Sequence, residues 1–278
     1  MGYKRILTVQ DISCVGQCSL TVALPVLSVC GHETAVLPSS VLSNHTTGFG
    51  GYTFRDLSDD MPSIKEQWVK ENINFSAIYT GYMGSEKQID NVIDIMGSVL
   101  KEEAVKIVDP AMADGGELYP GFDGNFVQYM KKLVAKADYL LPNLTEACLL
   151  TGTPYTEEYN QEFIISLCEK LKQLGCKNVV FTGVSYVEGT TGVVTYTDSG
   201  YSYYSHQKIG KGIPGTGDLF ASVFTGALLN GNTVADSAKA AADFVLECIQ
   251  LTHKYENHRY GPVFEPLLYK LGYMIKEG

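Results

Sequence analysis

Short apolar runs rich in β-branched residues alternate with longer segments of helical periodicity along almost the whole chain. This alternation constrains the fold strongly, because parallel strands are joined most simply by a crossing helix. The expected strands cover residues 5–9, 34–37, 77–80, 105–108, 139–141 and 178–181. The expected helices cover residues 19–29, 63–71, 86–101, 126–135, 145–150, 162–174, 218–229, 234–251 and 263–273. The sequence therefore predicts a three-layer α/β fold, with a mostly parallel central sheet and helices on both faces.

A β-hairpin is expected in the C-terminal half of the chain. Two alternating stretches, residues 192–197 and 201–206, flank Asp198-Ser199-Gly200, which is typical of a tight turn. No linker-like composition, charge block or repeat interrupts the 278 residues. We therefore expect residues 1–278 to form a single domain.

Charge and cysteine usage argue against several classes of protein. The formal net charge is −10 and the basic residues are scattered, so no basic stripe is present to bind nucleic acid. An acidic chain still binds ATP where backbone amides and Mg²⁺ supply local positive charge. The N-terminal apolar run is too short for a signal peptide, and no segment approaches the roughly 20 apolar residues of a membrane span. Seven cysteines without C-x-x-C spacing predict reduced thiols in a soluble cytoplasmic protein.

Several expected strands are followed directly by a polar side chain. These residues are Asp11, Tyr82, Asp109, Asn143 and Thr182. In open parallel sheets, ligands bind at the carboxyl ends of the strands. The sequence therefore predicts a ligand site along this edge of the sheet.

A glycine-rich segment, Pro214-Gly215-Thr216-Gly217-Asp218, precedes apolar residues at helical spacing. Glycines at a helix start let backbone amides approach an anion, which the helix dipole also favours. An acidic residue in a first helical turn is often only a partner of that dipole. Beside a bound phosphate, however, the carboxylate of Asp218 is repelled unless it accepts a proton. The segment therefore suggests that Asp218 deprotonates an alcohol while the amides of residues 215–217 stabilise the transferring phosphoryl group.

Two better-known phosphate motifs fit this segment poorly. A Walker A loop requires G-x-x-x-x-G-K-[ST], which the chain lacks. A dinucleotide fingerprint requires a small residue where Phe220 stands and normally opens the first strand–helix unit. By itself G-x-G-D is a weak motif, so its context decides its meaning.

In this context the chain resembles the ribokinase superfamily and, over nearly its whole length, the pyridoxal/pyridoxamine (vitamin B6) kinases. Six motifs occur in the family's order. They are Val41-Leu42-Ser43-Asn44-His45-Thr46, Thr80-Gly81-Tyr82-Met83-Gly84-Ser85, Val108-Asp109-Pro110 with Asp114, Leu141-Pro142-Asn143 with Glu146, Thr182-Gly183, and Gly215-Thr216-Gly217-Asp218-Leu219-Phe220. The resemblance implies a ribokinase-like fold and ATP-dependent phosphorylation of the 5′-hydroxymethyl group of a B6 vitamer.

The resemblance also implies roles for individual residues. Asp218 is the expected base, with Gly215, Thr216 and Gly217 completing the catalytic loop. The expected substrate-binding residues are Asp11, Ser13, Cys18, Asn44, His45, Thr46 and Tyr82. The expected nucleotide-binding residues are Asn143, Thr182, Gly183, Lys208, Ile209 and Thr216. Asp109, Asp114 and Glu146 are expected near Mg²⁺, which favours carboxylates and retained water. The superfamily commonly uses a monovalent cation such as K⁺, and homodimers are usual among its members.

One departure from the family leaves the substrate open. The first strand is followed by Asp11 and Ser13, where many pyridoxal kinases have Ser in place of the Asp. The pattern is reminiscent of hydroxymethylpyrimidine kinases, so phosphorylation of hydroxymethylpyrimidine is the first alternative. A non-catalytic nucleotide-binding module is the second alternative, against which the presence of Asp218 argues. A sugar kinase is disfavoured because residues 9–33 leave no room for its extra lid strands.

Overall fold

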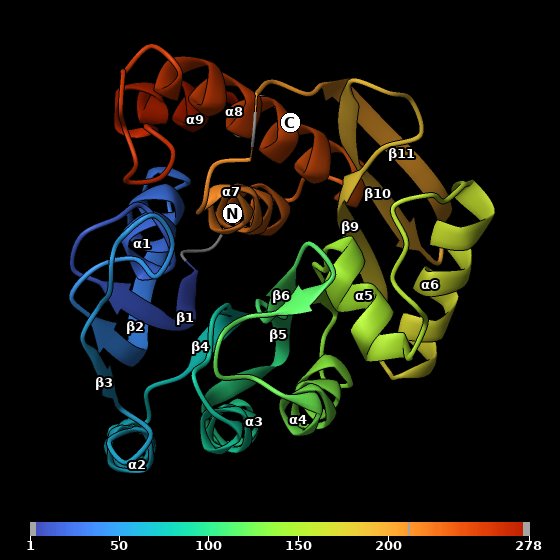
Figure 1. Cartoon of the computed structure of the whole chain (residues 1–278). Coiled ribbons are helices and arrows are strands. Elements are labelled where there is room, and N and C mark those ends of the chain that lie inside the picture. The colour runs from blue at the N-terminus through green and yellow to red at the C-terminus, as the bar shows by residue number, and fades with distance from the viewer. Residues whose placement is uncertain (1–3, 211, 275–278) are drawn as a thin grey trace.

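The computed structural model describes residues 4–210 and 212–274 and confirms the three-layer α/β architecture (Figure 1). Its main sheet runs in the order β11-β10-β9-β8-β5-β4-β1-β2-β3. The strands of this sheet are β1 (Arg5–Ser13), β2 (Glu33–Leu42), β3 (Phe54–Asp56), β4 (Phe75–Thr80), β5 (Leu100–Val108), β8 (Tyr139–Leu140), β9 (Asn178–Val184), β10 (Thr190–Thr197) and β11 (Gly200–Gln207). A separate ribbon pairs β6 (Ala113–Asp114) with β7 (Glu117–Leu118).

The middle of the main sheet is parallel and its two edges are antiparallel. β1 pairs in parallel with β2 and β4, and the parallel pairing continues through β5, β8 and β9. β3 and the β10–β11 hairpin are antiparallel to their neighbours. Because the central strands are covered on both faces, they read as continuous apolar runs, and most of β1 is buried. This explains why the sequence alone located them.

Two groups of helices cover the sheet, one on each face (Figure 1). One group consists of α2 (Met61–Lys70), α3 (Glu86–Val99), α4 (Gly124–Val134), α5 (Leu144–Thr151) and α6 (Gln161–Gln173). The other consists of α1 (Leu20–Val29), α7 (Thr216–Leu229), α8 (Val234–Thr252) and α9 (Leu268–Met274). Each group packs its own hydrophobic core against the sheet, so the chain has one core on either side.

The helix starts follow ordinary capping chemistry. The side chains of Ser85, Asp123, Asn160 and Thr233 each accept a backbone N–H in the first turn of the helix that follows. Asn143 forms a reciprocal capping box with the third residue of α5. These caps agree with the expected helix starts to within two residues.

Two predicted helix ends were wrong. The helix expected over residues 263–273 is a short 3₁₀ turn, Glu265–Leu267, followed by α9, because Pro266 has no N–H to donate to a longer helix. The helix expected to reach residue 101 ends at Val99, where the next residue turns extended and β5 begins. The short β3, β6 and β7 were not predicted, because two or three residues show no periodicity.

The predicted hairpin is confirmed as β10 and β11. The tyrosines of β11 divide between the two faces of the sheet. Tyr201 and Tyr203 pack against the core on the α6 side of the sheet, and Tyr204 packs against the core on the α8 side. Alternation along a strand makes this division unavoidable for residues 201, 203 and 204.

All seven cysteines are free thiols, and Cys14 alone among them is exposed. Among the described residues, no helix combines the length and apolar character needed to cross a membrane.

Candidate active site

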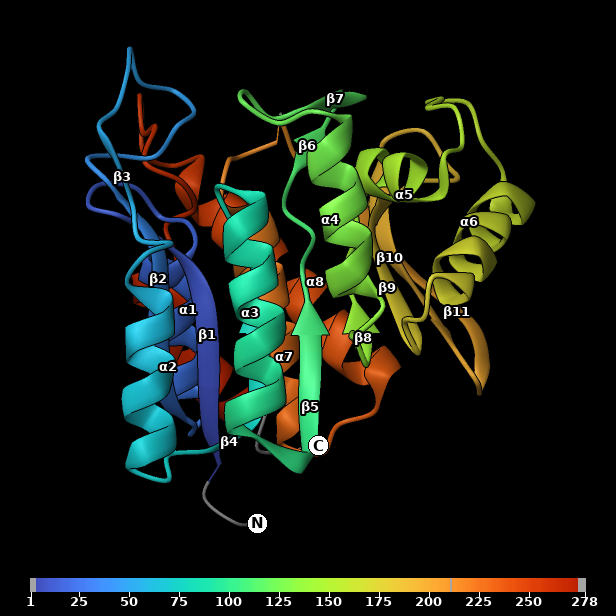
Figure 2. The same ribbon diagram turned by 90° about the horizontal axis from the view of Figure 1, so that it is seen from below.

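The carboxyl ends of the central strands meet the first turn of α7 at a cavity of about 490 Å³. Figure 2 shows β5 directed toward the end of the molecule that carries the β6–β7 ribbon, opposite the end at which β1 begins. The cavity is lined by Asp11, Ser13, Cys18, Ser19, Leu42, His45, Thr46, Thr47, Tyr52, Tyr82, Ala111, Asp114, Tyr119, Pro120, Gly212, Ile213, Pro214, Gly215, Thr216 and Asp218. Ten of the site residues predicted from the sequence therefore line this one cavity.

The glycine loop can adopt its shape only because position 215 lacks a side chain. Gly215 has φ 88°, and a Cβ there would lie 2.0 Å from the carbonyl oxygen of Gln17. No side chain caps the helix that follows, so the first amides of α7 are available to a ligand. The Thr216 N–H is the exception, because it donates to the Ile213 carbonyl at 3.3 Å. Of the three amides expected to face a phosphate, that of Thr216 is therefore already engaged within the loop.

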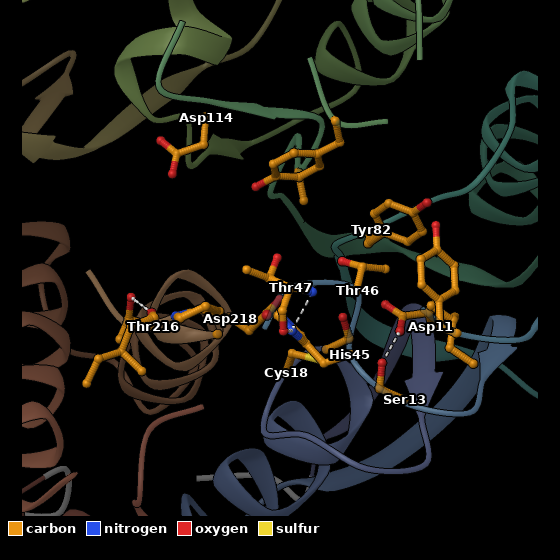
Figure 3. A pocket seen from close by; sticks show the side chains of 18 of the residues that line it. Asp11, Ser13, Cys18, His45, Thr46, Thr47, Tyr82, Asp114, Thr216 and Asp218 are labelled. Carbon is orange, nitrogen blue, oxygen red and sulfur yellow. Dashed lines mark hydrogen bonds between the residues drawn. The ribbon is translucent and has the colours of Figure 1, made fainter. Parts of the chain in front are cut away.

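Asp218 lies at this loop, in the first turn of α7, and its carboxyl borders the cavity (Figure 3). Burial raises the pKa of Asp218 to about 7, the Ser19 N–H lowers it, and the nearby Asp11 raises it. A carboxyl with this pKa exchanges its proton near neutral pH, which suits a general base.

Asp11 belongs to β1 rather than to the loop after it. The β1–β2 register shifts between Gln10 and Ile12, because Ser39 and Ser40 of β2 both lie opposite Asp11. The extra residue of this bulge therefore belongs to β2, and Asp11 stands on the strand that faces it. Asp11 is only 4% exposed, and the Ser13 hydroxyl donates to its Oδ2 at 3.2 Å. Burial raises the pKa of Asp11, while the Ser19 and Ser13 hydroxyls and the charge of His45 lower it.

The rest of this wall is aromatic and polar. Tyr82 stacks on Phe122, with ring centroids 5.7 Å apart, and burial raises the pKa of Tyr82 to about 12. Burial also raises the pKa of Cys18, followed by the negative charges of Asp218 and Asp11, so its thiol remains protonated at neutral pH. Figure 3 shows Tyr82, Thr46 and His45 on the Asp11 side of the cavity. This half of the cavity offers an aromatic ring and several hydrogen-bonding groups.

Asn44 does not reach the cavity wall. Its amide nitrogen donates to the carbonyls of His45 at 2.9 Å and Gly51 at 3.1 Å, and its amide oxygen accepts from Ser43. The side chain is thus committed to shaping the loop that carries His45 and Thr46. The SNHT motif places two side chains in the cavity and uses a third to hold them.

The three predicted metal-binding acids differ in exposure: Glu146 is buried, Asp109 is partly buried, and Asp114 is exposed at the cavity. Glu146 is 3% exposed and accepts the N–H groups of Asn143 at 2.9 Å and Met112 at 3.1 Å. Burial raises the pKa of Glu146 to about 7, and burial together with Glu146 and Asp218 raises that of Asp109. Asp114 instead lines the cavity and accepts the Gly115 N–H at 2.8 Å.

These acids do not form a direct metal cage. Within residues 4–210 and 212–274, no three His, Cys, Asp or Glu side chains are grouped so as to hold a metal ion. Carboxylates that raise each other's pKa are nevertheless the surroundings that a divalent cation relieves. The residues present therefore fit a Mg²⁺ ion that keeps much of its water.

Five of the six predicted nucleotide residues, all except Thr216, lie outside the cavity wall. The hydroxyl and N–H of Thr182 both point to the Pro142 carbonyl, beside Asn143, with the N–H at 2.9 Å. Gly183 follows in β9. Lys208 and Ile209 lie after β11, where the Lys208 N–H donates to the Gly189 carbonyl at 2.8 Å. Through neighbouring strands, Thr182 and Asn143 extend the same sheet edge away from Asp11.

Sequence reasoning missed several lining residues. Thr47 and Tyr52 lie in the loop after the SNHT motif, and Tyr119 lies beside the β6–β7 ribbon. Ser19 had been assigned only to a helix start. None of the four stands directly after a strand that the sequence predicted or belongs to a quoted motif, so only the folded arrangement brings them together.

Comparison with protein families finds one matching model, described as phosphomethylpyrimidine kinase, over residues 31–264. A crystal structure of a proposed phosphomethylpyrimidine kinase from Bacteroides thetaiotaomicron, in a form with pyridoxal, is 37% identical to the chain. It has a TM-score of 0.93 and covers 97% of this chain and 96% of its own.

Two further relatives are pyridoxal kinases. The crystal structure of the enzyme from Lactobacillus plantarum is 30% identical, with a TM-score of 0.91 and 99% of both chains covered. The pyridoxal kinase of Dictyostelium discoideum is 26% identical over 238 residues, which are 80% of this chain and 77% of that protein. The similarity extends over nearly the full length of the chain.

Proposed function

The chain belongs to the phosphomethylpyrimidine kinase family, and we propose that within this family it acts as a pyridoxal kinase. The proposed reaction transfers the γ-phosphoryl group of ATP to the 5′-hydroxymethyl group of a B6 vitamer. Relatives named pyridoxal kinase, and a related structure that contains pyridoxal, support this substrate class.

One observation carries the mechanism: a carboxyl of pKa about 7 at the start of α7, on the wall of the cavity. When ionised, Asp218 takes the proton of the 5′-hydroxyl as its oxygen attacks the γ-phosphorus and the bond to the β-phosphate oxygen breaks. The free amides of α7 and the helix dipole stabilise the negative charge on the transferring group. Asp218 later releases its proton to solvent, which restores the base.

The Asp11 side of the cavity is proposed to hold the acceptor ring. Tyr82 offers an aromatic face for a flat heterocycle, and Thr46 and His45 offer hydrogen-bonding groups. Asp11 accepts a hydrogen bond from a ring N–H or a hydroxyl. Holding the ring here leaves its hydroxymethyl group to reach toward Asp218.

The nucleotide is proposed to lie along the other part of the sheet edge, past Asp114 toward Thr182 and Lys208. A Mg²⁺ ion bound to the phosphates would neutralise their charge, and Asp109, Asp114 and Glu146 would hold it through water. We further propose, from the family resemblance, that the protein uses a monovalent cation and forms a homodimer. From the sequence we propose a cytoplasmic location and a single domain over residues 1–278.

Hydroxymethylpyrimidine is the second candidate substrate. Asp11 in place of the Ser of many pyridoxal kinases favours it, as does the description of the matching family model. Its ring also carries a primary alcohol, so Asp218 would perform the same chemistry on it.

A coupled assay of ATP consumption tests both substrates. Pyridoxal, pyridoxine, pyridoxamine and hydroxymethylpyrimidine are compared at equal concentration with Mg²⁺ present. We expect turnover with at least one B6 vitamer, and turnover at least about a hundredfold slower with the Asp218→Asn protein as control. Turnover with hydroxymethylpyrimidine alone would assign the second candidate, and no turnover with any of the four would refute the proposed function.

A further inference from the structure

Ser19 has a backbone conformation unusual for its residue type. Among the described residues, the non-glycine positions with positive φ are Ser19 (48°), Asn72 (54°) and Asn257 (60°). Asparagine tolerates this region, whereas serine seldom adopts it. The ψ of Ser19 is −129°, so the residue also lies outside the left-handed helical region. The part of φ/ψ space that it occupies strongly favours glycine.

The Ser19 side chain does not perform the task that its position suggests. It stands at the N-cap of α1, where a serine hydroxyl usually accepts an N–H of the first turn, yet it makes no such hydrogen bond. Its carbonyl still accepts the Val22 and Ala23 N–H groups, at 3.1 Å and 2.9 Å. The twisted backbone thus keeps the helix start and frees both the hydroxyl and the N–H of Ser19 for another use.

Both freed groups face a carboxylate of the cavity. Ser19 is 4% exposed and lines the cavity between β1 and α7. The Ser19 hydroxyl lowers the pKa of Asp11, and the Ser19 N–H lowers the pKa of Asp218. Figure 3 shows these two acids projecting into the same cavity from β1 and α7.

The surrounding loops prevent Ser19 from relaxing. The carbonyl oxygen of Gln17 lies 2.0 Å from the position of a Cβ on Gly215 and 2.6 Å from one on Gly261. The Gln17 N–H also donates to the Tyr260 carbonyl at 2.5 Å. The segment that leads into Ser19 is therefore packed between the glycine loop and the loop that contains Tyr260 and Gly261.

We infer that Ser19 is a positioning residue, which fixes the Asp11 carboxylate through its hydroxyl and the Asp218 carboxylate through its N–H. Its twisted backbone sets the distance between the group that binds the ring and the group that deprotonates the alcohol. The kinetic part of this inference rests on the proposed function, whereas its conformational part does not.

Two variants separate the hydroxyl from the backbone. Ser19→Ala and Ser19→Gly both remove the hydroxyl and keep the N–H. Because Asp11 loses a neighbouring hydroxyl that favours its charged form, we expect both to raise the KM for the vitamer about tenfold or more, with kcat changed by less than about threefold. Ser28→Ala, an exposed serine of the same helix, is the matched control and should leave both constants unchanged.

The pH profile gives a readout that a purely structural role would not move. The groups that face Asp11 are Ser13 on β1, Cys18 and Ser19 before α1, His45 after β2, Tyr82 after β4 and Asp218 on α7. Removing one donor from the Asp11 carboxylate raises its pKa. Since the vitamer is proposed to bind ionised Asp11, the rise in KM on acidification should begin at higher pH in both variants and at the wild-type pH in the control.

Thermal unfolding without substrate tests the backbone. Ser19→Gly should melt higher than Ser19→Ala by about 2–4 °C, because glycine adopts this φ without a Cβ penalty. An unchanged KM and pH profile in both variants would overturn the role of the hydroxyl. Ser19→Ala melting as high as Ser19→Gly would overturn the constrained backbone. A wild-type protein inactive on every vitamer would instead refute the proposed function, and the melting comparison would still decide the conformational part.

Discussion

Replacing Asp218 by asparagine tests the carboxyl on which the proposed mechanism depends. Asparagine keeps the size and one acceptor oxygen of the side chain, but it takes no proton. A general base contributes about 10²–10⁴ to the rate, so kcat should fall by that factor while the nucleotide affinity stays nearly constant. Steady-state kinetics and nucleotide binding to the two proteins measure the two effects separately.

The same substitution should stabilise the protein at alkaline pH. The pKa of Asp218 is about 7 in the folded chain, against an ordinary value of 3.8. Between these values the folded chain holds a proton that the unfolded chain has released, so stability falls as the pH rises. From pH 5 to pH 8 the difference corresponds to roughly two pKa units, or at most about 2–3 kcal/mol, and Asp218→Asn does not incur this loss.

Urea unfolding of both proteins at pH 5 and pH 8 measures this effect. The stability of Asp218→Asn relative to wild type should increase between the two pH values by up to that amount. An equal pH dependence in both proteins would show that the carboxyl is not desolvated in the fold. A variant that keeps more than about a tenth of wild-type turnover would refute the role as base.

Gly215→Ala should abolish turnover, because the added Cβ would lie 2.0 Å from the Gln17 carbonyl oxygen and the backbone there has φ 88°. Gly97→Ala, in α3 with open space around it, is the control and should have full activity. An active Gly215→Ala protein would contradict the close packing. Glu146→Gln should raise the Mg²⁺ concentration needed for half-maximal activity severalfold, since one buried negative charge is lost, and an unchanged Mg²⁺ titration would count against its place near the metal. Cys18 should react slowly with a thiol reagent at pH 7.5, since its pKa is raised by burial; modification as fast as that of a free thiol would disprove its protonated state.

The cavity shows where sequence reasoning succeeds and where it stops. The SNHT motif predicted His45 and Thr46 on the wall, and both are there. Asn44 from the same motif forms hydrogen bonds within its own loop instead. A motif reports that residues act together, but whether a side chain meets the ligand or supports its neighbours depends on which way it points.

Strand and helix boundaries follow the same division. The buried central strands and amphipathic helices carry their own periodicity, so they could be located to within a few residues. β3, β6 and β7 are two or three residues long and exist because a partner strand lies beside them. No local pattern could have indicated them.

By itself, the sequence determined the layers of the fold and the glycine loop in front of Asp218, because apolar periodicity and glycine content act over a few neighbouring residues. The tertiary structure decided the chemistry of the site. It placed Asp11 opposite a bulge of β2, twisted the backbone of Ser19 at the wall of the same cavity, and buried Asp218 enough to raise its pKa to about 7. Burial and charge proximity depend on residues far apart in the chain, so they arise only when the sheet and α7 come together.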